Sequence, residues 1–199
     1  GGILNYDVSN PSWDERDRFI PSKTHCVLSN FPALVKAGYL KEEDLLSFHK
    51  DGGLLAGHPW NVEIGLEFAG GSLGMGIGVA IGLALTAKRF GKKYKTYVLL
   101  GDGESNEGSV WEALMSASQY KLDNLVVIVD YDNMQFDGRN DNIMSLAPLR
   151  DKLIAFGFEN KRKLLLQTFC YLCLNMLITG GAILVSSVSK AIYHNNMFV

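Results

Sequence analysis

The sequence predicts an α/β fold of three layers, in which helices cover both faces of a parallel sheet. Two strongly apolar segments, TYVLL at residues 96–100 and LVVIV at residues 125–129, have the composition of strands buried on both faces. Between them, the segment WEALMSASQY at residues 111–120 has the pattern of a helix. A strand, helix and strand in this order form a right-handed crossover, so both strands end at the same edge of the sheet.

Further elements flank this unit. The segment at residues 72–90 has apolar side chains four positions apart, which predicts a helix with one buried face. Its four glycines should each weaken that helix by up to ~1 kcal/mol relative to alanine, so another backbone or a cofactor is expected to pack closely against it. The remaining patterns predict a short strand at residues 19–22 and helices at residues 31–37, 41–50 and 149–156.

The chain divides at about residue 158. Residues 1–158 form one predicted domain, and residues 159–199 form a divergent apolar tail, interpreted as the last helix and strand (182–188) of the same domain. Residues 164–189 lack charged side chains, but polar residues and a Gly-Gly pair interrupt the run, so a membrane span is not favoured. A third interpretation is an altered segment that never packs natively.

Composition excludes several functional classes. The 199 residues carry a net charge of −2, and the basic residues are spread out, so nucleic-acid binding is not expected. Three cysteines do not indicate a disulfide framework and favour a reducing, cytoplasmic setting. Cys170 and Cys173 form a single C-x-x-C among apolar residues, which favours buried thiols over a zinc or redox site.

The two strand ends carry the candidate chemistry. The first strand runs into Gly101-Asp102-Gly103, where glycines allow a phosphate close to the backbone, and a helix start offers unpaired N–H groups. Thirty residues after Asp102, the second strand is followed by Asp132 and Asn133. Carboxylate and amide oxygens are ligands that magnesium prefers, so this edge of the sheet is predicted to bind a magnesium diphosphate.

These motifs together resemble one family. A GDG followed about thirty residues later by an asparagine ligand is the pattern of thiamine diphosphate enzymes. The motifs GDGESNEG, VDYDNMQFDG and GHPW followed by GGSLGMG resemble the transketolase family, over about residues 1–158. The resemblance is strongest to the N-terminal subunit of split bacterial transketolases, and it implies the thiamine diphosphate-binding fold. It also implies a preceding segment with a further active-site histidine, so the domain is expected to be incomplete at its N-terminus.

The resemblance implies a set of cofactor ligands. Asp102 is expected to bind Mg²⁺ (or Ca²⁺), the amides of Gly101 and Gly103 to contact the diphosphate, and the Met134 carbonyl to bind the metal. The spacing places Asp132 where the family usually has asparagine. A shift of one residue would bring in Asn133 instead, and both assignments stay open.

Other family positions are expected near the cofactor or the substrate. His25, in SKTH, and His58, in GHP, match histidines that reach the diphosphate or the substrate oxygens, and a neutral imidazole can donate or accept a proton there. Leu73 matches a leucine that packs on the cofactor rings, and Glu107 matches an acidic residue at a subunit boundary. Thr24 replaces a family glycine and would be strained if that position needs a positive φ.

The implied activity is transfer of a two-carbon ketol unit between ketose and aldose phosphates. The glutamate that activates the aminopyrimidine ring belongs to a pyrimidine-binding domain, so the chain is expected to need that C-terminal subunit and a second copy of itself. Two alternatives stay open. One is a catalytically inactive transketolase remnant, and the other is a different thiamine diphosphate enzyme, which the SKTH, GHPW and GESNEG details favour less.

Overall fold

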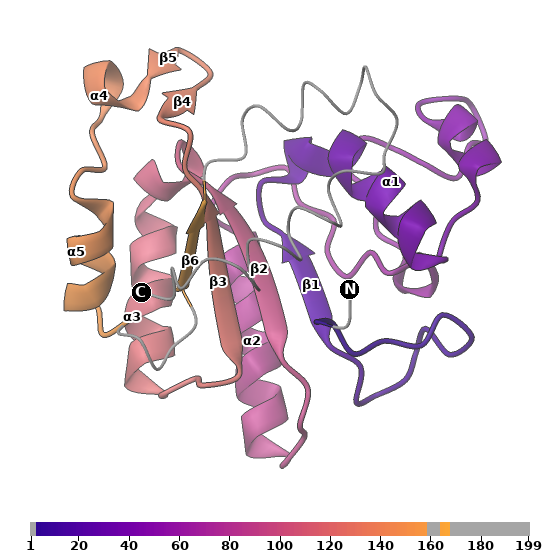
Figure 1. The fold of residues 1–199 in the computed structure, drawn as a ribbon, viewed down its shortest axis with the longest axis horizontal. Helices are drawn as coiled ribbons and strands as arrows, with labels where there is room; N and C mark the ends of the chain where they lie inside the picture. Colours follow the sequence, from indigo (N-terminus) through magenta and orange to yellow (C-terminus); the bar gives the residue numbers. More distant parts are fainter. Residues whose placement is uncertain (1–2, 159–163, 168–199) are drawn as a thin grey trace.

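The protein is built on a four-stranded parallel sheet. The computed structural model describes residues 3–158 and 164–167 (Figure 1). The strands lie in the order β1-β2-β3-β6 and all run in the same direction. Their bounds are β1 Arg18–Pro21, β2 Thr96–Gly101, β3 Leu125–Asp130 and β6 Leu164–Gln167. The parallel α/β architecture predicted from the sequence is therefore confirmed.

The central strands are apolar because they form the main core. Side chains such as Val98, Leu100 and Val127 are almost fully buried. Burial of each such side chain contributes about 1.5–3 kcal/mol relative to its exposed state. In the register of β2 and β3, Gly101 pairs with Asp130, so both strands end at the same level. The loops that follow the two strands thus start side by side, as the crossover unit predicted.

Two helices lie side by side on one face of this sheet (Figure 1), α2 (Gly76–Arg89) and α3 (Gly108–Gln119). The predicted apolar face of α2 is confirmed at Ile77 and Ile81, which are buried. However, the helix begins at Gly76 and not at residue 72. Gly74 has φ +75°, a left-handed backbone that breaks the helical path before it starts.

A smaller core surrounds α1 (Val27–Ala37), which starts four residues earlier than predicted and ends at Gly38 with φ +92°. Phe31 and Leu34 pack there against residues of the following loops. The predicted helix at residues 41–50 is instead a 3-10 helix, η2 (Glu42–Ser47). His49 has φ +54°, which an α-helix through residue 50 does not allow.

The remaining elements follow β3. The predicted helix at residues 149–156 is confirmed as α5 (Leu149–Ala155). A hairpin of β4 (Met134–Gln135) and β5 (Gly138–Arg139) and the short α4 (Asn140–Ile143) were not predicted. The 3-10 turns are η1 (Thr24–Cys26), η3 (Val62–Ile64) and η4 (Glu104–Asn106).

The tail contributes one described element. Leu164–Gln167 forms a strand that pairs with β3, where the sequence suggested a helix. The predicted strand at residues 182–188 and the two cysteines Cys170 and Cys173 lie outside the described residues. Among the residues that are described, no helix combines the length and apolar character that crossing a bilayer requires.

Candidate diphosphate and metal site

The GDG turn (residues 101–107) places a buried carboxylate at the end of β2. Asp102 is 4% exposed, and its backbone N–H donates to the Asp130 carbonyl at 3.1 Å. Its Oδ1 accepts from the Gly103 N–H at 2.8 Å. The other oxygen, Oδ2, is buried without a hydrogen-bond partner among the described residues. Burial raises the pKa of Asp102, and the nearby charge of Asp132 raises it further.

A second turn starts the loop that follows β3, here called the Asp132 loop (residues 131–145). Asp132 Oδ1 accepts from the Met134 N–H at 2.9 Å, which closes an Asx turn. Asn133 stands at its corner with φ +61° and directs its amide N–H to Asp141. Asp132 is near enough for its charge to act on Asp102. The side-chain nitrogen of Asn133 is engaged by Asp141, and its Oδ1 is buried without a hydrogen-bond partner among the described residues.

The glycine amides of the GDG turn already have acceptors in this structure. The Gly101 N–H donates to Glu104 Oε2 at 3.0 Å, and the Gly103 N–H donates to Asp102. A Cβ at Gly103 would lie 2.8 Å from Gln135 Cβ, so glycine is what lets the Asp132 loop approach. Contact of these two amides with a diphosphate stays a prediction.

Glu104 is a structural residue that the sequence reasoning missed. Its side chain is 2% exposed. Oε1 accepts from Ser22 Oγ and from the Gly74 N–H at 2.8 Å, while Oε2 accepts from Gly101. This one carboxylate joins the end of β1, the turn before α2 and the end of β2. Its position directly after the GDG, in η4, was the only sequence feature that pointed to this role. A glutamate there also resembles an exposed residue in the first turn of a helix.

An ion pair crosses the same edge of the sheet. Lys23 Nζ lies 2.7 Å from Asp130 Oδ2, and both side chains are mostly buried. The lysine follows β1 and reaches β3 across β2. A Cβ at Gly101 would lie 3.7 Å from two carbons of the Lys23 side chain, so the lysine passes directly over this glycine. This ion pair could not be identified from the sequence, because the pairing depends on the order of the strands in the sheet.

The two predicted histidines lie in different loops, His25 after β1 and His58 before α2. His25 is exposed on η1, and partial desolvation together with the charge of Lys23 lowers its pKa. At neutral pH this favours the neutral imidazole. His58 is also exposed, and its ring lies 3.8 Å from the position that a Cβ at Gly71 would take. The loop with His58 therefore lies beside the turn that precedes α2.

Leu73 and Glu107 lie near that same turn. Leu73 is half-buried within it. Glu107 is exposed just before α3, and its Cβ lies 3.0 Å from the position of a Cβ on Gly74. Because Glu104 bonds to Gly74, this turn is held against the GDG turn. The predicted residues thus gather around the carboxyl edge of the sheet.

Comparison with known proteins decides the family. The family model described as "Transketolase, thiamine diphosphate binding domain" matches residues 2–162. The chain belongs to the transketolase family. It is 44% identical over 157 residues to a subunit of the apulose-4-phosphate transketolase of Phocaeicola vulgatus, an alignment that covers 79% of this chain and 56% of that protein. It is 42% identical over 151 residues to human transketolase, covering 75% of this chain and 23% of the human protein.

Solved transketolases have the same fold. The structure of transketolase from Leishmania mexicana superposes with a TM-score of 0.74 at 32% identity, covering 84% of this chain and 30% of the other. The enzyme from Campylobacter jejuni gives a TM-score of 0.74 at 29% identity, covering 83% of this chain and 30% of that one. The chain spans a little more than half of the length of the Phocaeicola vulgatus relative and about a quarter of the human enzyme.

The departure from the transketolase pattern at Thr24 is accommodated in the fold. Thr24 opens η1 and is not in the left-handed region, so the backbone strain considered from the sequence does not occur. Its buried Oγ1 donates to the Ser22 carbonyl at 3.2 Å. A Cβ at Gly70 would lie 2.0 Å from this Oγ1, so the threonine side chain occupies the space next to that glycine.

Proposed function

We propose that this chain supplies the diphosphate-binding half of a transketolase active site. The observation that carries the proposal is the buried Oδ2 of Asp102, which has no partner among the described residues and lies beside the turn that holds Asp132. A buried carboxylate oxygen without a donor is costly unless a cation or proton satisfies it. Oxygen ligands from two adjacent strand ends fit Mg²⁺, or Ca²⁺, with a diphosphate as the remaining ligand.

In this proposal Asp102, Asp132 and the Met134 carbonyl hold the metal. The spacing from Asp102 supports the assignment of Asp132. Asn133 is the alternative, because its Oδ1 is also buried without a hydrogen-bond partner among the described residues. Gly101 and Gly103 line the diphosphate site, and their amides exchange their present acceptors for phosphate oxygens. Leu73 packs against the cofactor rings, and Glu107 faces the boundary with another subunit.

Bound thiamine diphosphate would supply a nucleophilic thiazolium carbon that accepts the two-carbon unit of a ketose phosphate and passes it to an aldose phosphate. The chain's own residues bind and orient. His25 and His58 donate or accept hydrogen bonds at phosphate and sugar oxygens. The lowered pKa of His25 keeps its imidazole neutral at the pH of the cytoplasm, where we place the protein.

A partner is part of the proposal. The Phocaeicola vulgatus relative is named as one subunit of its enzyme, and a relative from a Clostridium species, 39% identical over 158 residues, is named as a 6-deoxy-6-sulfo-D-fructose transketolase subunit. We infer that a second subunit with the pyrimidine-binding domain completes the site, and that a second copy of this chain joins the assembly. The chain by itself is not expected to turn over.

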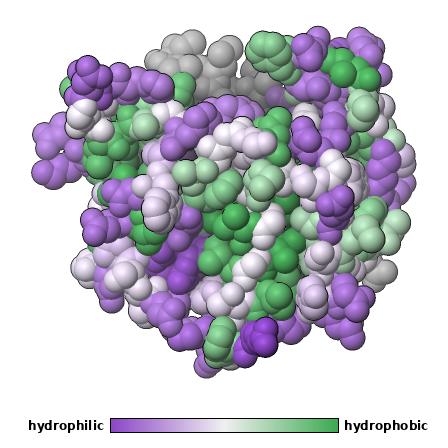
Figure 2. Space-filling view, turned by 180° about the vertical axis from the view of Figure 1, so that it is seen from behind, coloured by the Kyte–Doolittle hydropathy of each residue, from purple (hydrophilic) through white to green (hydrophobic). Residues whose placement is uncertain are grey.

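The outer face of α2 and α3 fits such an assembly. Figure 2 shows apolar and neutral atoms along the middle of the face opposite to the view of Figure 1. Val79 and Met115 on these helices and Met75, directly before α2, are exposed, and the space beyond Gly78 and Gly82 is open. Small residues on an exposed helix let another backbone approach closely, and exposed apolar side chains of this kind mark interaction surfaces.

The test is reconstitution with the second subunit of a two-part transketolase. Ketol transfer from a ketose phosphate to an aldose phosphate is measured with thiamine diphosphate and Mg²⁺ present. The mixture is expected to be active, the Asp102→Ala mixture inactive, and a mixture with the exposed control Asp137→Ala as active as the wild type. If the wild-type mixture binds the cofactor but transfers no ketol unit, the inactive-remnant alternative replaces the proposal.

A further inference from the structure

The part of the proposed site that would bind the metal contains two carboxylates, those of Asp102 and Asp132, and their surroundings differ. Asp102 is only 4% exposed, and its Oδ2 has no partner among the residues that the structure describes. Asp132 is half-buried, with Oδ1 held by the Met134 N–H. The turn that contains Asp132 follows β3, whose last residue, Asp130, accepts a hydrogen bond from the Asp102 N–H at 3.1 Å. The backbone therefore places the two acidic residues at the same edge of the sheet.

Nearby positive charge does not cancel these two carboxylates. Lys23 pairs with Asp130 at 2.7 Å, so its charge is shared with a third carboxylate at this edge. Glu104 is a fourth acidic group, but it accepts three hydrogen bonds and is thereby satisfied. The printed ion pair and hydrogen bonds therefore leave Asp102 Oδ2 without a cationic or hydrogen-bonding partner among the described residues.

From this arrangement we propose that Asp102 and Asp132 bind one divalent cation in the absence of thiamine diphosphate. The inference rests on the proposed function and adds an order of assembly to it. An asparagine at position 132 would leave a single carboxylate, and the cation would then need the diphosphate to balance its charge. With aspartate, the protein itself supplies two negative charges to a divalent ion, so the ion binds first and the diphosphate binds to the loaded site.

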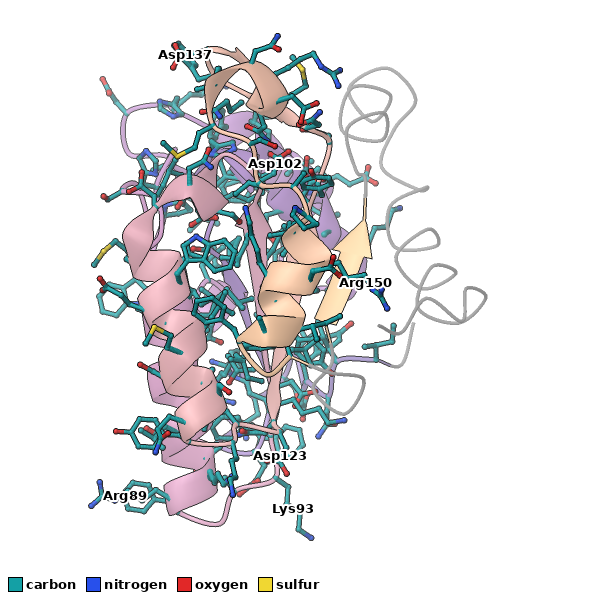
Figure 3. All side chains as sticks on the ribbon, turned by 90° about the vertical axis from the view of Figure 1, so that its left-hand side faces the viewer. Arg89, Lys93, Asp102, Asp123, Asp137 and Arg150 are labelled. Atoms are coloured by element: carbon teal, nitrogen blue, oxygen red, sulfur yellow. The ribbon has the colours of Figure 1, made fainter. Side chains whose placement is uncertain are left out.

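The substitution that tests this is Asp132→Asn. Asparagine retains an Oδ1 that can accept from the Met134 N–H, so the Asx turn and the fold are expected to persist. The matched control is Asp137→Asn, which removes the same charge from the same loop. Asp137 is exposed, and Figure 3 shows it at the tip of the loop, away from Asp102. Circular dichroism and the melting temperature verify that all three proteins fold.

The measurement is depletion of the electron paramagnetic resonance signal of free Mn²⁺ by the chain, without cofactor. Wild type and Asp137→Asn are expected to bind one Mn²⁺ with equal affinity, and Asp132→Asn to bind it about tenfold or more weakly, since one of two ligand charges is lost. No depletion by wild type alone, or equal depletion by Asp132→Asn, would overturn the inference.

Failure of this inference is distinguishable from failure of the proposed function. Thiamine diphosphate binding with Mg²⁺ is measured on the same preparations together with the second subunit. If the chain binds thiamine diphosphate but takes up no Mn²⁺ when the cofactor is absent, only the order of assembly is overturned. Mn²⁺ uptake without any cofactor binding overturns the proposed function, while the two-carboxylate cation site stands.

Discussion

The GDG turn and the Asp132 loop lie at the same edge of the sheet, but they are built differently. The GDG turn is buried, and Glu104 joins it to two other segments through three hydrogen bonds. The Asp132 loop consists of a hairpin with two-residue strands and a four-residue helix, and Phe136 at its end is fully exposed. One half of the proposed site therefore belongs to the core, and the other half lies on its surface.

This difference predicts where substitutions act. Changes in the buried half should alter the free energy of unfolding, because they leave buried groups without partners or crowd a packed space. Changes in the exposed half should alter local order or ligand affinity with little effect on global stability.

The largest expected effect is that of Glu104→Ala. The variant leaves the Ser22 hydroxyl and the amides of Gly74 and Gly101 without their acceptor in a buried place. We expect a loss of about 3 kcal/mol or more in the free energy of unfolding, measured by urea denaturation. Glu112→Ala, at an exposed position of α3, is the control and should change it by less than about 0.5 kcal/mol. Equal effects of the two variants would mean that the hydrogen bonds of Glu104 do not stabilise the fold.

Gly70→Ala should come next. Its new Cβ would lie 2.0 Å from Thr24 Oγ1 and 2.7 Å from Phe68 Cε1, so these side chains must move. Such crowding costs about 1–3 kcal/mol. In a double-mutant cycle with Thr24→Gly, the alanine is expected to cost about 1 kcal/mol less, because the threonine side chain is gone. Strict additivity of the two substitutions would show that the two residues do not compete for this space.

Asp102→Asn should stabilise the chain that lacks metal while it weakens metal binding. The pKa of the Asp102 carboxyl is raised because burial disfavours its ionised form, and asparagine removes that charge, so we expect the free energy of unfolding to increase at pH 7. Because the pKa of Asp102 is higher in the folded than in the unfolded chain, the wild type loses stability as the pH rises through the folded pKa. The advantage of the asparagine variant should therefore vanish at acidic pH, where the wild-type carboxyl is protonated. Thermal melts from pH 4 to pH 8 measure this. A constant difference across that range would contradict it.

The smallest global effect is expected for Gln135→Ala. Gln135 Nε2 donates to Asn106 at 3.2 Å and to Asn140 at 2.6 Å, and thereby connects the Asp132 loop to the GDG turn. Its loss should change the free energy of unfolding by less than about 1 kcal/mol, because the loop is mostly exposed. Amide hydrogen exchange should nevertheless become faster within residues 131–145 and stay unchanged in β2 and β3. Uniformly faster exchange would contradict the separation of the two halves.

The sequence predicted the buried half of the fold better than the exposed half. Strands β2 and β3 are apolar enough to identify on their own, and the order of strand, helix and strand then places Asp102 beside the Asp132 loop. The hairpin of β4 and β5 has strands of two residues each, which are too short for a periodic pattern. The start of α2 was predicted too early, because periodicity does not reveal the left-handed backbone of Gly74.

The candidate site shows a similar limit. Its proposed metal ligands and histidines stand in motifs, so the sequence is enough to predict them, whereas the contacts of Glu104 and Lys23 could not be predicted. Glu104 bonds to Ser22, which is 82 positions away, and Lys23 pairs with Asp130, which is 107 positions away. These contacts depend on the order of β1, β2 and β3 in the sheet, so they follow from the tertiary structure and not from local sequence.

The most direct test of the central claim is a calorimetric titration of thiamine diphosphate into the chain with Mg²⁺ and the second subunit present. The wild type and the exposed control Asp137→Ala are expected to give saturable binding of one cofactor per chain, and Asp102→Ala none. An absence of binding by the wild type, or undiminished binding by Asp102→Ala, would contradict a cofactor site at the carboxyl ends of β2 and β3.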